Sequence, residues 1–195
     1  GIGQGYTQTT PLQLCMMTAQ IANGGYAIKP KIIVDNNPVS YEDAKQSMEN
    51  QLLFDSDSEL LGDKKLFKNK KNIKIVQEAM FSSTNERFGT SYKSRIDDPK
   101  YQFAGKTGTA QVKRISKRER ELDLAIEQIP YKDRDHALYI AYGPYINPRY
   151  ALSIIVEHGG SGSKAAAPIA KELFKLIIDR HELRKKQSNF ERIAI

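Results

Sequence analysis

One short segment combines side chains that could bind and polarise a reacting group: Lys106-Thr107-Gly108-Thr109. A strand interior usually favours branched side chains and is weakened by glycine. Here, however, Gly105 and Gly108 lie on either side of Lys106-Thr107, and a second hydroxyl follows at Thr109. Glycine lets a ligand or another backbone approach a strand closely, and the lysine and threonines could then hold an anionic or oxyanionic group. This segment is therefore the leading candidate for a binding or catalytic site.

Two other patterns resemble parts of a serine acyl-transfer centre. Ser161-Gly162-Ser163-Lys164 satisfies Ser-x-x-Lys, and Ser83-Thr84-Asn85 satisfies Ser-x-Asn. A lysine that acts as the base for a serine has to be desolvated, whereas Lys164 follows a Gly-Ser turn and is expected to be exposed. We therefore predict that Ser161 or Ser163 caps the last helix, and we keep a hydrolase that uses Ser161 and Lys164 as a rival interpretation.

The elements before the Lys-Thr-Gly segment include two predicted helices. A Thr-x-x-Gln capping box at Thr10 starts the first helix, and Gly24-Gly25 ends it. A cap at Asn72 precedes apolar residues at helical spacing and predicts the second helix. The other segments are predicted as an extended edge piece (26–34), surface excursions (35–72) and a charged helix (116–126).

Three strands are predicted to position the chemistry, at residues 102–112, 136–145 and 150–157. Turn-forming residues at 146–149 join the last two strands as a hairpin. An amphipathic helix follows, from about residue 165 to 183. We expect its apolar stripe to pack on one face of the sheet: Ile169, Leu173, Leu176 and Ile177.

The composition is typical of a globular domain, because 39% of the 195 residues are apolar and 27% are charged. These values argue against a disordered, collagen-like or coiled-coil chain. No run approaches the roughly 18 apolar residues of a membrane span, and the first residues do not look like a signal peptide. The lone cysteine, Cys15, excludes an internal disulfide framework and is expected to be a small core residue.

The net charge is +7, and it is concentrated in residues 61–120, which hold 16 basic and 6 acidic side chains. Such a field could attract nucleic acid, anionic lipid or an anionic substrate. The basic stretches 64–74 and 113–120 carry no aromatic stacking pattern and no recognised nucleic-acid-binding module, so a solvated face is preferred. A non-enzymatic basic module that binds nucleic acid or anionic lipid stays open as an alternative.

No cofactor or metal is predicted. The three histidines have neither the spacing of metal ligands nor a companion acidic cluster: His136, His158 and His181.

Several motifs follow one another along the chain. They are Gly3-Gln4-Gly5-Tyr6, Thr10-Pro11-Leu12-Gln13-Leu14, Ala22-Asn23-Gly24-Gly25, Lys106-Thr107-Gly108-Thr109-Ala110-Gln111, Arg134-Asp135-His136, Tyr142-Gly143-Pro144-Tyr145 and Val156-Glu157-His158-Gly159-Gly160. This ordered series, over about residues 1–182, resembles the C-terminal part of the transpeptidase domain of class B penicillin-binding proteins and is most similar to the cell-elongation branch of that family. In penicillin-binding proteins the Lys-Thr-Gly element accompanies a Ser-x-x-Lys nucleophile.

The resemblance implies an α/β fold in which helices cover both faces of an antiparallel sheet. It implies a serine D,D-transpeptidase that cross-links peptidoglycan stem peptides and is acylated by β-lactams, without a cofactor. Lys106 would supply positive potential and assist proton transfer, while the Thr107 and Thr109 hydroxyls would bind the carboxylate of a D-alanyl terminus or of penicillin. The Thr109 N–H would be an oxyanion-hole donor, and Gly105 and Gly108 would let the peptide lie along the strand edge.

The resemblance also places the family's nucleophile upstream of the point that Gly1 matches. We therefore expect residues 1–183 to be the C-terminal part of a catalytic domain, with a polar tail at 184–195, and we expect this chain alone to turn over no substrate. The implied partners are the stem peptide, β-lactams and a membrane glycosyltransferase of the elongation machinery, at the periplasmic face of the bacterial inner membrane. Loss of the covering helices predicts an exposed apolar patch and self-association.

Overall fold

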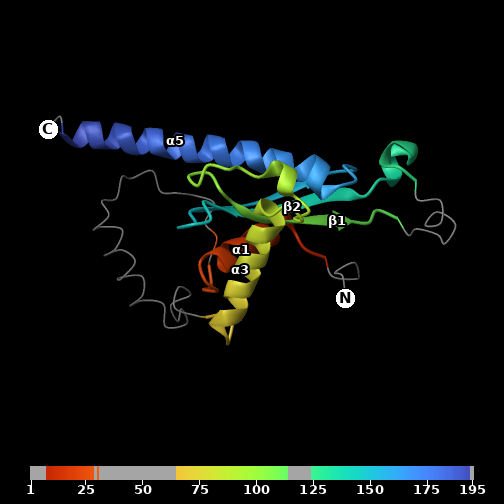
Figure 1. Cartoon of the computed structure of the whole chain (residues 1–195), viewed down its shortest axis with the longest axis horizontal. Coiled ribbons are helices and arrows are strands. Elements are labelled where there is room, and N and C mark those ends of the chain that lie inside the picture. The colour runs from red at the N-terminus through yellow and green to blue at the C-terminus, as the bar shows by residue number, and fades with distance from the viewer. Residues whose placement is uncertain (1–7, 29, 31–64, 114–123, 194–195) are drawn as a thin grey trace.

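A three-stranded antiparallel sheet forms the centre of the computed structural model, which describes residues 8–28, 30, 65–113 and 124–193 (Figure 1). β1 (Ala104–Ala110) pairs with β2 (His136–Gly143), and β2 pairs with β3 (Tyr150–Val156). The three predicted strands and their consecutive antiparallel order are confirmed, although each strand is shorter than predicted.

Helices lie on both faces of this sheet, as the α/β prediction required. α1 (Pro11–Ala22) and α3 (Lys70–Asn85) cover one face, and α5 (Ala167–Ile193) crosses the other (Figure 1). Neighbouring side chains of a strand point to opposite faces. Tyr139 and Ala141 of β2 therefore pack toward α5, while Tyr142 packs with residues of α1 and α3.

The first helix begins as predicted. Thr10 Oγ1 accepts a hydrogen bond from the Gln13 N–H at 3.2 Å, and Gln13 Oε1 accepts one from the Thr10 N–H at 2.8 Å. Gly24 and Gly25 follow the helix with φ values of 87° and 92°, which glycine adopts without the steric cost of a side chain. The capping box and the glycine stop are both confirmed.

The second helix, α3, begins earlier than predicted. Its N-cap is Asn69 rather than Asn72, and Asn69 Oδ1 accepts a hydrogen bond from the Lys71 N–H at 2.9 Å. The reason is that Lys70 and Lys71 are good helix formers that can fill a first turn. Most of the segments predicted at 35–72 and 116–126 lie outside the described residues; Ile126 itself opens a short 3₁₀ turn, Ile126–Gln128.

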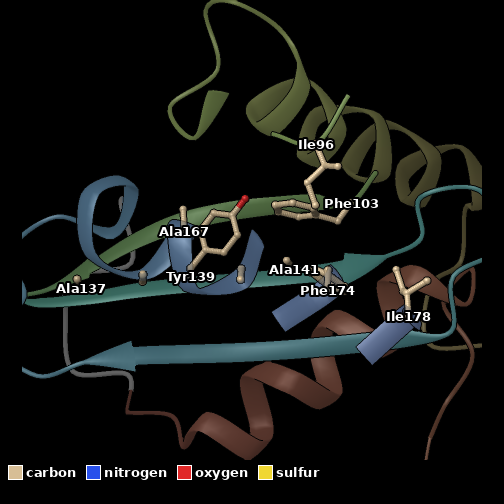
Figure 2. Close-up of a cluster of buried hydrophobic side chains, with 10 residues drawn as sticks. Ile96, Phe103, Ala137, Tyr139, Ala141, Ala167, Phe174 and Ile178 are labelled. Atoms are coloured by element: carbon tan, nitrogen blue, oxygen red, sulfur yellow. The ribbon is translucent and has the colours of Figure 1, made fainter. Parts of the chain in front are cut away.

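The face of α5 that packs on the sheet is not the predicted one. Among the α5 side chains whose burial the structure describes, up to residue 184, the fully buried ones are Ala167, Ala170, Phe174 and Ile178 (Figure 2). Ile169 and Leu176 are exposed, and Leu173 and Ile177 are only half-buried, so the predicted stripe was wrong. Because apolar residues occur on both sides of this helix, the sequence does not determine which side packs on the sheet. The small alanines let the helix lie close to the strands.

α5 also continues to Ile193, beyond the expected end at residue 183 and into the predicted tail. Length alone does not make it a membrane helix: among the described residues, no helix combines the length and the apolar character that crossing a bilayer requires.

Cys15 lies in α1 and is half-buried. Its thiol donates a hydrogen bond to the Ala151 carbonyl at 3.4 Å, and burial raises the pKa of the thiol above its usual value. A raised pKa lowers the thiolate population, so this environment agrees with the predicted role as a small core residue.

Three side chains fasten α5 to the segment that precedes β1. Lys100 Nζ donates to Asp179 Oδ1 at 2.9 Å, and Tyr101 Oη donates to the same oxygen at 2.5 Å. Both bonds favour the ionised carboxylate. The Lys100 ammonium first, and the Tyr101 hydroxyl second, therefore hold the pKa of Asp179 below its usual value.

We expect Asp179→Asn to destabilise the fold in a pH-dependent way. A carboxyl group with a lowered folded-state pKa stabilises the fold above its unfolded-state pKa of about 4, and this contribution is lost as the pH falls through the folded-state value. The difference in free energy of unfolding between wild type and variant should be constant above about pH 5 and shrink on acidification. Urea denaturation over this range measures it, and a difference that grows toward low pH would contradict the assignment.

Candidate functional site

Lys106-Thr107-Gly108-Thr109 lies in β1, at an edge of the sheet. In the described part of the chain β1 pairs only with β2, so its other side carries no strand. The side chains of Lys106 and Thr109 are exposed, and Thr107 is half-buried. An unpaired strand edge with accessible polar side chains has the form of a site that receives an extended ligand.

The ammonium and one hydroxyl of the segment meet at this edge. Strand alternation places Lys106 and Thr107 on opposite faces. Even so, Lys106 Nζ donates to the Thr107 carbonyl at 2.8 Å and to Thr107 Oγ1 at 3.2 Å. A cation and a hydroxyl group that converge in this way can hold a carboxylate.

A buried hydroxyl cluster holds the start of the segment against α3. The Gly105 N–H donates to Thr84 Oγ1 at 3.0 Å, and Thr84 Oγ1 shares a hydrogen bond of 2.9 Å with Tyr139 Oη. Tyr139 Oη also lies 3.1 Å from Ser91 Oγ. Thr84, Ser91 and Tyr139 are buried, and burial raises the pKa of the Tyr139 phenol, so it serves as a neutral hydrogen-bonding group.

Gly105 is required by this cluster. A Cβ at residue 105 would lie 2.3 Å from Tyr139 Oη, so the space that the glycine leaves is filled by the phenol rather than open to a ligand. Gly108 has more room, since its Cβ would meet only the Leu138 Cβ, at 3.3 Å. Of the two glycines in the predicted site, Gly108 is the one whose surroundings leave space.

The Ser83-Thr84-Asn85 pattern has a structural role at the end of α3. Thr84 holds Gly105 as described, and Asn85 Nδ2 donates to the Phe103 carbonyl at 2.9 Å. Ser83 Oγ lies 3.3 Å from Thr90 Oγ1, which in turn lies 3.2 Å from Thr107 Oγ1. The helix end thus supports residue 103, just before β1, and the first half of β1 up to residue 107.

Three residues of this arrangement were not predicted from the sequence: Thr90, Ser91 and Tyr139. A polar Gly-Thr-Ser sequence after a helix, at residues 89–91, was the available signal for the first two. No sequence signal pointed to Tyr139. Its contact with Gly105 depends on the strand register, which pairs Tyr139 with Thr107 and so places its ring beside the neighbouring Gly105.

Lys164 lies in a π-helical turn, Gly162–Ala166 (η4), before α5, and Ser161 is the N-cap residue of that turn. The Ser161 hydroxyl shares a hydrogen bond of 3.0 Å with the Ser163 hydroxyl, and Lys164 is exposed. The predicted cap position is confirmed at Ser161, but its side chain makes no capping hydrogen bond; the Ser161 carbonyl accepts from the Lys164 and Ala165 N–H groups instead. This geometry does not favour a serine–lysine dyad.

The histidines fasten strand ends. The His158 N–H donates to His136 Nδ1 at 2.9 Å, and His158 Nδ1 lies 3.0 Å from the Arg134 carbonyl. His181 stacks edge-on against Tyr150 at 6.0 Å between ring centroids. Over residues 8–28, 30, 65–113 and 124–193, no group of three or more His, Cys, Asp or Glu side chains could hold a metal ion.

Comparison with known proteins identifies relatives over most of the chain. Residues 1–175 match the family model of the penicillin binding protein transpeptidase domain. The peptidoglycan D,D-transpeptidase MrdA of Salmonella typhimurium is 32% identical over 183 residues, which are 92% of this chain and 26% of that protein. The chain thus spans about a quarter of the length of this curated relative.

Solved structures show the same similarity. Pseudomonas aeruginosa PBP2, in complex with WCK 5153, is 30% identical with a TM-score of 0.60, and the match covers 90% of this chain and 32% of that one. Helicobacter pylori PBP2, in complex with MreC, is 29% identical with a TM-score of 0.59, covering 90% of this chain and 26% of that one.

Proposed function

Because the chain belongs to the penicillin-binding protein transpeptidase family, we propose that it forms the edge-strand wall of the acyl-transfer site of a peptidoglycan D,D-transpeptidase that β-lactams also occupy. The observation that carries this proposal is the meeting of Lys106 Nζ and Thr107 Oγ1 on the edge of β1 that no strand of the described residues pairs with. Membership of the family and the names of the relatives support the reaction class.

Each residue of the segment has a proposed role in that reaction. Lys106 supplies positive potential and assists proton transfer, and the hydroxyls of Thr107 and Thr109 bind the carboxylate of a D-alanyl terminus or of penicillin. The Thr109 N–H is an oxyanion-hole donor, a type of group whose removal costs roughly 3–4 kcal/mol of transition-state stabilisation. Gly108 lets the peptide backbone lie along the strand.

The nucleophile is proposed to be a serine other than Ser161. The Ser161 hydroxyl is bonded to Ser163, and Lys164 is exposed, whereas a lysine base has to be desolvated. Within these 195 residues, Ser161 to Lys164 is the one match to Ser-x-x-Lys. We therefore propose that these residues alone bind substrate without turning it over.

The proposed place of action is the periplasmic face of the inner membrane, with a membrane glycosyltransferase as a partner. Peptidoglycan lies outside the cytoplasm, and the relatives named for peptidoglycan transpeptidation support this location. Self-association stays a prediction.

We expect Lys106→Ala to weaken binding of an acyl-D-alanyl-D-alanine peptide about tenfold. The variant removes the positive charge beside the carboxylate and the charge-assisted hydrogen bond from Lys106 Nζ to Thr107 Oγ1, a type of bond worth roughly 1.5–3 kcal/mol that solvent at this exposed edge reduces toward the lower value. Titrations that follow backbone amide resonances of the chain measure the Kd and show whether residues 104–110 are the ones perturbed.

Lys74→Ala is the matched control, because Lys74 is an exposed lysine of α3 that forms an ion pair with its helix neighbour Glu78 at 3.8 Å. It should leave the Kd unchanged, and equal weakening by both variants would favour an unspecific basic surface. Covalent labelling by a fluorescent penicillin that Ser161→Ala abolishes would favour the rival hydrolase instead.

A further inference from the structure

A line of hydroxyl groups runs from the end of α3 to the site. Ser83 Oγ lies 3.3 Å from Thr90 Oγ1, Thr90 Oγ1 lies 3.2 Å from Thr107 Oγ1, and Lys106 Nζ lies 3.2 Å from the same Thr107 oxygen. Thr107 is therefore contacted by a side chain of β1 on one side and by the loop after α3 on the other.

Donor and acceptor counts decide how this line is oriented when an anion binds. A hydroxyl group has one proton to donate and two lone pairs to accept, whereas an ammonium only donates. Lys106 thus uses one lone pair of Thr107 Oγ1. A carboxylate only accepts, so Thr107 has to give it the proton, and the bond to Thr90 then has to be donated by Thr90.

The same reasoning continues one step further back. Because Thr90 donates to Thr107, its oxygen is free to accept from Ser83, and all hydroxyl bonds point toward the ligand. Bonds that are aligned in one direction polarise one another, which strengthens the last donor. With both of its lone pairs occupied, Thr107 Oγ1 has no capacity left to accept from a ligand that donates, such as an amide NH₂.

The backbone on both sides of Thr90 is held against α3. The Gly89 N–H donates to the Glu86 carbonyl at 2.8 Å, and a Cβ at residue 89 would lie 2.3 Å from the Ser83 carbonyl oxygen. The Ser91 N–H and Oγ both donate to that same Ser83 carbonyl, at 3.1 and 3.0 Å. The Thr90 side chain is exposed, and these backbone hydrogen bonds fix the position of the turn that carries it.

From this arrangement we infer that Thr90, backed by Ser83, is a positioning residue that fixes the Thr107 hydroxyl as a donor and selects a carboxylate over an amide at the end of the ligand. The inference rests on the proposed function, because it assigns a new residue to the same peptide-binding edge. Thr90 acts through Thr107.

The test compares Thr90→Val, which keeps the shape of the side chain and removes the hydroxyl, with Thr90→Ser, which keeps the hydroxyl. The first measurement is the χ1 rotamer of Thr107 in the free chain, from NMR scalar couplings. The second is the ratio of Kd values for an acyl-D-alanyl-D-alanine peptide and its C-terminal amide. We expect Thr90→Val to release the rotamer and reduce the preference for the carboxylate about fivefold, the effect of losing one hydrogen bond, and Thr90→Ser to retain both.

Two results would overturn the inference. One is a Thr107 rotamer and a carboxylate preference that Thr90→Val leaves unchanged; the other is a Thr90→Ser variant that behaves like Thr90→Val, which would mean that shape and not the hydroxyl matters. Failure of the proposed function looks different. If the proposed function fails, the wild-type chain binds the two peptides equally or binds neither. In that case Thr90 has no ligand-selecting role, even if Thr90→Val changes the rotamer of Thr107.

Discussion

Gly105→Ala is expected to destabilise the chain by about 3 kcal/mol or more and to displace the Lys106 edge of β1. The new methyl group would lie 2.3 Å from Tyr139 Oη and 2.5 Å from the ring carbon Cζ. Tyr139 is fully buried and bonded to Thr84 and Ser91, so it has no free space to move into. Either the ring or β1 has to shift, and the buried hydroxyl groups then lose partners.

The sign of this effect identifies its cause. Alanine in place of glycine usually stabilises an extended segment slightly, because it reduces the freedom of the unfolded chain. Gly108→Ala is the matched control in the same strand, since its methyl group would meet only the Leu138 Cβ, at 3.3 Å. Urea denaturation should show a large loss for Gly105→Ala and less than about 1 kcal/mol for Gly108→Ala. Similar losses for both would mean that Tyr139 does not occupy this space.

Phe174→Ala should cost about 3–5 kcal/mol of unfolding free energy. Phe174 is fully buried and stacks on Phe103 with ring centroids 4.9 Å apart (Figure 2). It also rests on Gly143, where an added Cβ would lie 2.9 Å from the ring. Removing the ring leaves a cavity between α5 and the sheet, and backbone on both sides limits collapse into it.

Leu176→Ala tests the phase of α5 in the same experiment. Leu176 is 67% exposed, so its loss should change the unfolding free energy by less than about 0.5 kcal/mol. Both unfolding curves should be measured in urea with a shared slope, so that the midpoints report stability alone. A larger loss for Leu176→Ala than for Phe174→Ala would restore the predicted stripe of Ile169, Leu173, Leu176 and Ile177 and reject the observed packing.

The candidate site could be located from the sequence in part. Lys106 to Thr109 stood out because a lysine, two hydroxyls and a glycine share one strand, and that combination is visible without any tertiary contact. Thr90 and Tyr139 could not be found in this way. Their roles depend on which atoms β1 meets across the sheet and across the end of α3, and no local pattern carries that information.

The helices show the same division. The capping box at Thr10 was predicted correctly because it is made by residues three apart, whereas the start of α3 was misplaced since two asparagines nearby can both cap a helix. The packing face of α5 was wrong. The prediction selected large apolar residues for the packing face, whereas the face that packs on the sheet combines small alanines with Phe174 and Ile178.

The sequence alone determined the strands, the capped first helix, the order of motifs that places the chain in its family, and the residues that can do chemistry. Each of these depends on neighbours along the chain, so composition and spacing are enough. Three relations were decided only by the tertiary structure. Gly105 leaves the space that the Tyr139 phenol fills, residues 83–85 form hydrogen bonds that support β1, and the Thr90 hydroxyl lies within hydrogen-bonding distance of the Thr107 hydroxyl. These contacts join residues from 7 to 55 positions apart, and they arise only when strand pairing and helix packing bring the groups within hydrogen-bonding distance.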